Sequence, residues 1–169
     1  MDQLWAPWRM TYIEGPKQPG GQCVFCAARD AADDAAVHVL HRGKLCFAIL
    51  NRYPYNNGHL MVVPHEHAGS LAEVTDAGLA EMIQLASRWT EVVRAVMHCD
   101  GFNLGFNLGS SAGAGIRDHL RLHLVPRWLG DTNFMPVVGN VKVVPEELDQ
   151  TWRKLRAAWS QMAPTDGRS

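Results

Sequence analysis

Strict alternation over residues 118–125, Asp-His-Leu-Arg-Leu-His-Leu-Val, constrains the fold of this chain more than any other stretch. A period of two is the side-chain repeat of a β-strand, so the leucines would face one side and His119, Arg121 and His123 the other. The leucine face must bury itself in a core. A row of ionisable side chains is costly to bury unless it meets a ligand, a metal or an anion. The strand predicted over His119–Val125 is therefore the candidate active site.

Composition points to one folded domain with no strong charge bias. The chain has 169 residues, 47% hydrophobic and 20% charged, and its formal net charge is −1. These values favour a globular protein and argue against nucleic acid or a membrane surface as its partner. No apolar run approaches the roughly 20 residues of a membrane span, and the N-terminus lacks the basic region of an export signal. We therefore expect a cytoplasmic protein with reduced thiols.

The order of the predicted elements favours an α+β fold over a doubly wound one, because strands dominate the middle of the chain around one long helix. The predicted strands are Val37–His41, Leu45–Leu50, His59–Pro64, Phe102–Leu108 and His119–Val125, and a further one at Pro136–Val144 stays open. Thr75 is expected to cap the long helix, and Pro145 to open a C-terminal helix. We predict an arm at 1–22 packed on the domain, one domain at 23–163 and a flexible tail at 164–169.

A CxxC pair, Cys23-Val24-Phe25-Cys26, is a candidate metal site. The pair alone is a weak signal, and a redox motif would need a surrounding βαβ pattern that this chain lacks. A zinc site needs two more ligands, which the chain offers in His67 and His119. Such a Cys2His2 set would be structural, because protein atoms fill all four positions. Two unbound surface cysteines remain the alternative at this point.

Several motifs, taken together and in order, resemble the histidine triad (HIT) superfamily, most of all the bacterial branch that contains diadenosine tetraphosphate phosphorylase-like proteins. The matching pieces are Leu4–Arg9, Cys23–Cys26, Leu50–His59, Asn107–Gly109, Ala112–Gly115, His119–Trp128 and Gly130–Phe134. The resemblance extends from about Leu4 to Trp159, which is nearly the whole chain.

The resemblance implies an α+β, HIT-like fold: a five-stranded antiparallel sheet with one long central helix and a C-terminal helix, paired as a homodimer. It implies that structural zinc is held by Cys23, Cys26, His67 and His119. It also implies a site for an AMP-like mononucleotide or a dinucleoside polyphosphate. The implied binding residues are Asn51 near the ribose, Asn107, Gly113 and Gly115 near the phosphate, Arg121, His123, and Trp128 in the wall. A glycine-rich loop suits this role because its backbone N–H groups can approach an anion closely.

The chain departs from the family pattern at one position. That pattern is His-φ-His-φ-His-φ-φ, with φ apolar and the middle histidine as the nucleophile, whereas this chain has Arg121 there. A guanidinium has no lone pair to offer and stays protonated, so it cannot form the covalent nucleotidyl intermediate. It can still pair with phosphate oxygens. We therefore expect a nucleotide-binding protein with little or no catalysis.

Two alternatives stay open. One is an active HIT hydrolase or transferase of the diadenosine polyphosphate type, with His123 as a substitute nucleophile. A strand offset of one pleat would misplace His123 by several ångströms, which near-attack geometry hardly tolerates. The other alternative is an inactive variant of such an enzyme.

Overall fold

The computed structural model describes residues 23–109, 119–131 and 146–162, so the predicted arm at 1–22, the tail at 164–169 and the open region 136–144 lie outside the described residues. The centre is a five-stranded antiparallel sheet in the order β1-β2-β3-β5-β4. Its strands are β1 (Val39–Arg42), β2 (Cys46–Leu50), β3 (Leu60–Pro64), β4 (Gly101–Phe106) and β5 (Leu122–Arg127). The helices are α2 (Val24–Asp30), the 3-10 helix η1 (Leu71–Glu73), α3 (Asp76–Met97) and α5 (Leu148–Met162). The α+β class and the five-stranded sheet are confirmed.

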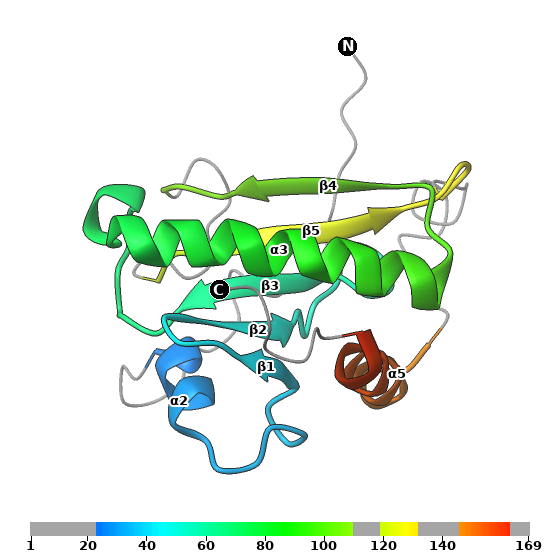
Figure 1. Cartoon of the computed structure of the whole chain (residues 1–169), viewed down its shortest axis with the longest axis horizontal. Helices are drawn as coiled ribbons and strands as arrows, with labels where there is room; N and C mark the ends of the chain where they lie inside the picture. The colour runs from blue at the N-terminus through cyan, green and yellow to red at the C-terminus, as the bar shows by residue number, and fades with distance from the viewer. Residues whose placement is uncertain (1–22, 110–118, 132–145, 163–169) are drawn as a thin grey trace.

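The two faces of the sheet carry two separate apolar clusters. Side chains alternate along a strand, so neighbouring residues of β2 and β3 join different clusters. The cluster under α3, which crosses one face of the sheet (Figure 1), contains Cys46, Ala48, Leu50, Leu60 and Val62. The cluster on the other face contains Phe47, Ile49, Met61 and Val63 together with Phe25 and Ala28 of α2. Both faces are covered, which is why these strands are apolar throughout.

Helix α3 begins after the N-cap residue that the sequence predicts. The Thr75 hydroxyl accepts a hydrogen bond from Gly78 N at 3.1 Å, which confirms the expected N-cap. The helix ends at His98, whose backbone is left-handed (φ 52°). Its buried stripe includes Trp89, and the Trp89 ring stacks on Trp159 of α5 with centroids 4.3 Å apart. No helix within the described ranges is both long and apolar enough to cross a bilayer.

Helix α5 closes one edge of the sheet. Trp152 Nε1 donates to the Val39 carbonyl at 2.9 Å, and the Arg156 guanidinium donates to the Leu40 carbonyl. An edge strand otherwise presents unpaired backbone groups, which invite pairing with another chain. Strand β1 is thus protected, whereas β4 forms the opposite edge.

The predicted strand His119–Val125 was placed too early by about three residues, since β5 runs over Leu122–Arg127. The ladder between β3 and β5 stops at the Val62–Leu122 pair. Proline has no N–H to continue a ladder, and β3 ends at Pro64. Leu120 N instead donates to Ala68 O at 2.6 Å, so the segment before β5 bonds to the loop after β3.

Candidate functional site

The alternation that marked residues 119–124 is present in the structure, although only part of it is strand. Leu120, Leu122 and Leu124 belong to the cluster under α3. His119, Arg121 and His123 are also buried, with exposed fractions of 1%, 7% and 8%. His123 pairs with Met61, which belongs to the cluster on the face opposite α3. The ionisable row therefore lies inside the protein, where each member needs polar partners.

His123 is bonded to a second buried histidine, His59. The His59 Nε2 and His123 Nδ1 atoms lie 3.0 Å apart, and His59 is 1% exposed. His59 lies directly before β3 and two residues before Met61, so both imidazoles point to the same face of the sheet. The Tyr55 ring lies over His59 with centroids 4.8 Å apart.

Backbone geometry fixes how the proton is shared in this pair. Tyr55 N donates to His59 Nδ1 at 3.1 Å, so that nitrogen is an acceptor and His59 carries its proton on Nε2. The Nε2–H then donates to His123 Nδ1, which leaves His123 with its proton on Nε2. The Asn51 amide lies 3.3 Å from His59 Nδ1 and its backbone N donates to His59 O at 2.9 Å. Asn51, His59 and His123 thus form one polar chain that ends in an N–H donor.

Arg121 lies between this chain and a cysteine–histidine cluster. Its Nη1 donates to the His119 carbonyl at 3.1 Å. Its guanidinium carbon lies 5.7 Å from the centroid of the Phe25 ring, within the range of a cation–π contact. A guanidinium in this place can bind an anion through its planar fork of N–H donors, but it cannot attack phosphorus.

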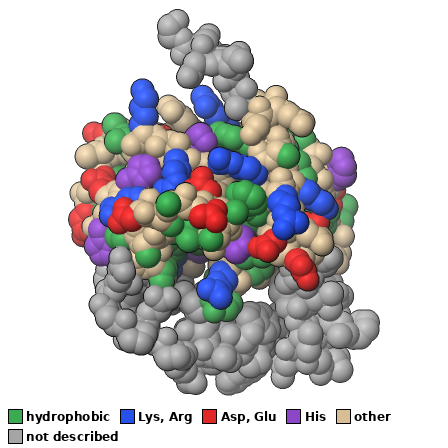
Figure 2. Space-filling view, turned by 90° about the horizontal axis from the view of Figure 1, so that it is seen from below, with side chains coloured by type: hydrophobic (Ala, Val, Ile, Leu, Met, Phe, Trp, Pro, Cys, Tyr) green, Lys and Arg blue, Asp and Glu red, His purple; other side chains and the backbone are tan. Residues whose placement is uncertain are grey.

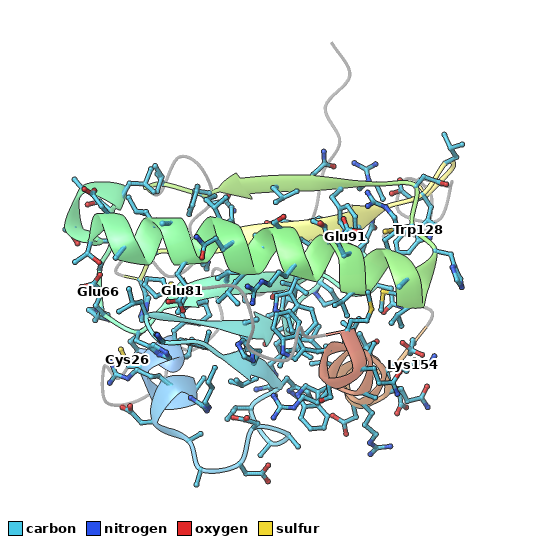
Figure 3. All side chains as sticks on the ribbon, in the orientation of Figure 1. Cys26, Glu66, Glu81, Glu91, Trp128 and Lys154 are labelled. Carbon is cyan, nitrogen blue, oxygen red and sulfur yellow. The ribbon has the colours of Figure 1, made fainter. Side chains whose placement is uncertain are left out.

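The four predicted metal ligands come together from three separate segments. The ligand atoms of Cys23, Cys26, His67 and His119 all lie within 4.8 Å of one another. His119 Nδ1 is 3.2 Å from Cys23 Sγ and 3.7 Å from Cys26 Sγ, and His67 Nδ1 is 3.3 Å from Cys26 Sγ. Tetrahedral Zn²⁺ with ordinary bond lengths would place sulfur and nitrogen about 3.5 Å apart. The donor set and its spacing fit zinc, with Cys26 reaching out from α2 (Figure 3).

The tautomer of His119 also suits a metal ligand. Its Nε2 donates to the Pro64 carbonyl at 2.9 Å, which directs the Nδ1 lone pair toward the two sulfurs. Burial lowers the pKa of His119 below its ordinary value of 6.5, so the ring is neutral at pH 7. Burial raises the pKa of the Cys26 thiol, a shift that a bound cation would oppose.

A polar network anchors the loop that carries Tyr55. Asp131 accepts from Arg127 Nε at 2.5 Å and from Arg127 Nη2 at 2.9 Å. Asn56 Nδ2 donates both to Asp131 Oδ2 and to Pro126 O, each at 2.9 Å. The loop before β3 is thereby tied to the end of β5, which fixes the Tyr55 N–H that bonds to His59.

The remaining predicted binding residues differ in their placement. Asn107 follows Phe106, which pairs with Leu122, so the strand register sets Asn107 level with Arg121. Trp128 is not beside His123: it packs on the cluster under α3, and its Nε1 donates to Met97 O at 3.3 Å. Figure 3 shows Trp128 at the opposite end of the molecule from Cys26. Gly113 and Gly115 lie outside the described residues.

Charges of both signs are mixed on the face of the protein seen in Figure 2, where acidic and basic side chains of the described residues lie interspersed.

His59 was not among the site residues that the sequence predicted. Its signal was its place directly after Asn57-Gly58 and at the start of an apolar strand, two residues before Met61. Period two would have set His59 on the same face as Met61. Only the pairing of Met61 with His123 reveals that the two imidazoles meet.

Comparison with known proteins agrees with the fold and the motifs. The HIT domain model matches residues 33–128. AP-4-A phosphorylase of Mycobacterium tuberculosis strain H37Rv is 40% identical over 168 residues, covering 95% of this chain and 86% of its own length. A Zn-bound histidine triad family protein from Mycobacterium smegmatis has a TM-score of 0.67 at 29% identity, covering 83% of this chain and 94% of its own. A hypothetical histidine triad nucleotide-binding protein from Sulfolobus tokodaii has a TM-score of 0.65 at 25% identity, covering 82% and 93%.

These matches define the class: an α+β domain with a histidine-rich strand of the HIT type. This chain belongs to the HIT family.

Proposed function

We propose that this protein binds an AMP-like mononucleotide or a dinucleoside polyphosphate and that it lacks the usual nucleotidyl-histidine chemistry. The observation that carries the proposal is Arg121, buried between two histidines of the family strand. A guanidinium there can hold a phosphate through two parallel hydrogen bonds. It cannot carry a nucleotidyl group, because it has no lone pair at any working pH.

Groups around Arg121 support phosphate binding. The His59–His123 chain ends in an N–H donor on His123 Nε2, which can share a phosphate oxygen with Arg121. Asn107 is level with Arg121 in the strand register and supplies an amide. Asn51, bonded to His59, is assigned to the ribose side. Gly113 and Gly115 are proposed to bring backbone N–H groups to the same phosphate.

One observation favours an active enzyme as the second candidate. A relative that is 40% identical over 95% of this chain is named an AP-4-A phosphorylase. The retained His59–His123 pair would serve an enzyme as well as a receptor. In such an enzyme His123 would be the residue that carries the chemistry, and Arg121 would stabilise charge on the phosphate.

Binding and turnover separate the two candidates. Calorimetry with the full chain should detect AMP, and no binding at millimolar AMP would overturn the proposal. Phosphorolysis of diadenosine tetraphosphate should be near background in the wild type and rise by several orders of magnitude in Arg121→His, since the nucleophile returns. Arg121→Lys, which keeps the charge without an imidazole, is the control and should gain nothing. Wild-type turnover equal to that of Arg121→His would support the enzyme instead.

We also propose that Cys23, Cys26, His67 and His119 hold one structural zinc. The geometry of the four ligand atoms and the Zn-bound mycobacterial relative support this assignment. When bound, zinc would join α2 to the segments around His67 and His119 and would take no part in turnover. Metal analysis should find about one zinc per chain. Thiolate ligands persist in a reducing compartment, so the proposal places the protein in the cytoplasm.

A homodimer through the β4 edge is the proposed assembly. Helix α5 caps the β1 edge, whereas β4 carries the exposed side chain of Leu104 (48%) and is followed by exposed Leu108 (45%). An apolar sheet edge of this kind is suited to pairing with a second copy. Light scattering should give twice the chain mass, and Leu104→Lys should shift it toward the monomer. Leu129→Lys, at a leucine outside the edge that is still more exposed, is the control.

A further inference from the structure

We propose that Phe25 positions Arg121 for the nucleotide phosphate and that zinc binding strengthens nucleotide binding through this contact. The inference rests on the proposed nucleotide site and adds a coupling between that site and the metal centre. Phe25 stands between the two cysteines of the CxxC pair, and its side chain packs in the cluster that contains Met61, the strand partner of His123.

Phe25 contacts both the proposed metal ligand His119 and the phosphate-binding residue Arg121. Its ring lies edge-on to the His119 ring with centroids 5.5 Å apart, and the Arg121 guanidinium carbon lies 5.7 Å from its centroid. Arg121 in turn donates to the His119 carbonyl. The metal ligand His119, the Phe25 ring and the Arg121 guanidinium are therefore in mutual contact, and all three residues are buried.

Helix α2 is so short that a bound metal would fix the position of its first turn. It has seven residues, too few to be stable as an isolated helix. Arg42 secures its far end by donating to the carbonyls of Arg29 and Ala28 at 2.6 and 3.0 Å. At the near end, Cys23 has no side-chain cap bond to the helix, and its sulfur faces His119. Metal ligation would link this turn to His67 and His119 through coordinate bonds to one ion.

Two consequences follow for the ligand. A fixed Phe25 ring holds the guanidinium in one orientation, so less conformational entropy is lost when a phosphate binds. The effect acts through the phosphate, because Arg121 is the group that the ring positions. Nucleotides with a 5′-phosphate should respond to the metal and to Phe25, whereas adenosine should not. By linkage, AMP must raise zinc affinity by the factor by which zinc raises AMP affinity.

The experiment uses calorimetry on the zinc-loaded full chain with AMP and with adenosine. Phe25→Leu should weaken AMP binding about tenfold and leave adenosine binding within about twofold, since a buried cation–π contact has roughly that value. Phe25→Tyr keeps the ring face and should restore AMP binding. Phe47→Leu makes the same change in the same apolar cluster, where the ring stacks on His65 rather than on Arg121, and should have no effect on AMP.

Zinc analysis and a double-mutant cycle of Phe25 and Arg121 complete the test. Zinc content must stay near one per chain in Phe25→Leu, so that a loss of binding is not a loss of metal. In Arg121→Gln, the added Phe25→Leu change should weaken AMP binding no further, because the positioned group is already gone. Chelated wild type should bind AMP about tenfold more weakly if it stays folded by circular dichroism. If it unfolds, the Phe25 variants alone decide.

Several results would overturn the proposal. Equal weakening of AMP and adenosine by Phe25→Leu would mean that the ring contacts the nucleoside directly. Equal effects of Phe25→Leu and Phe47→Leu would mean a general loss of packing. If AMP binds neither the wild type nor any variant, the proposed function fails. The contact between Phe25 and Arg121 can then be tested separately, by the ring-current shift of the Arg121 side-chain NH signal in NMR. That signal should move in Phe25→Leu and stay in Phe47→Leu, and no difference would refute the positioning role.

Discussion

Replacement of Asp131 by alanine should lower the free energy of unfolding by about 2 kcal/mol, because it cuts the network that holds the loop before β3. The carboxylate accepts two bonds from Arg127 and one from Asn56, at 2.5–2.9 Å. A charge-assisted hydrogen bond contributes about 1.5–3 kcal/mol. Arg127 is nearly half exposed, so water replaces much of what it loses, and Asn56 keeps its bond to Pro126 O. About one such bond is therefore lost in net terms, which corresponds to a fall in Tm of about 4–8 °C.

Calorimetric melting of wild type and Asp131→Ala from pH 7 to pH 2 is the assay. The hydrogen bond from Arg127 holds the pKa of Asp131 well below its ordinary value of 3.8. A carboxyl with a lowered folded-state pKa stabilises the protein above its unfolded pKa and loses that contribution as pH falls toward the folded one. The Tm difference should be full at pH 7 and shrink below about pH 4.

Asp30→Ala is the matched control. Asp30 accepts from Arg29 Nε at 2.7 Å and from Nη2 at 2.9 Å, a bidentate pair between sequence neighbours on the surface. Its removal should change Tm little, because it ties no separate segments together. Equal losses in both variants, or an Asp131→Ala difference that stays constant into acid, would refute the assignment of stability to the Asp131 network.

Two further predictions concern the metal and the long helix. Cys23→Ser should lower both zinc content and Tm, because metal-binding energy is also folding energy; unchanged stability of the metal-free wild type would contradict this. Thr75→Ala should lower the free energy of unfolding by about 1 kcal/mol in denaturant melts, because it removes the N-cap bond to Gly78. Thr90→Ala, inside the same helix and partly exposed, should be neutral or slightly stabilising, so equal losses at both positions would argue against the cap.

Much of the fold follows from patterns that lie within single segments. Apolar runs predicted all five strands near their observed positions, and Thr75 was identified as the cap of α3. The predicted start of β5 was wrong, because the observed start depends on where the partner strand β3 ends. Pro64 ends the partner strand, so Leu120 bonds to Ala68 instead of extending the ladder. The alternation over residues 118–125 predicted which face each side chain occupies, but it could not predict where the neighbouring strand β3 ends.

The site shows the same division. The CxxC pair and the ionisable row were visible locally, and the expected four ligands do converge. His59 was missed because its partner His123 is 64 residues away in the sequence, and only the strand register brings the two together. The resemblance placed Trp128 in the wall of the nucleotide site, but Trp128 packs on the cluster under α3 with Leu122 and Leu124. Period two assigns an even-numbered residue here to that face, so the alternation alone would have placed it there.

Position 121, directly before β5, is a place where the chemistry can change at little cost to folding. The leucines on either side of it fill the core under α3, and His119 belongs to the four-ligand cluster. A guanidinium at 121 retains polar and aromatic partners, since it bonds to the His119 carbonyl and lies on Phe25. The fold, the cluster and the His59–His123 pair can therefore persist when an imidazole at 121 is replaced by arginine. Binding and catalysis separate at this residue, because phosphate affinity needs only a positioned cation whereas nucleotidyl transfer needs a lone pair.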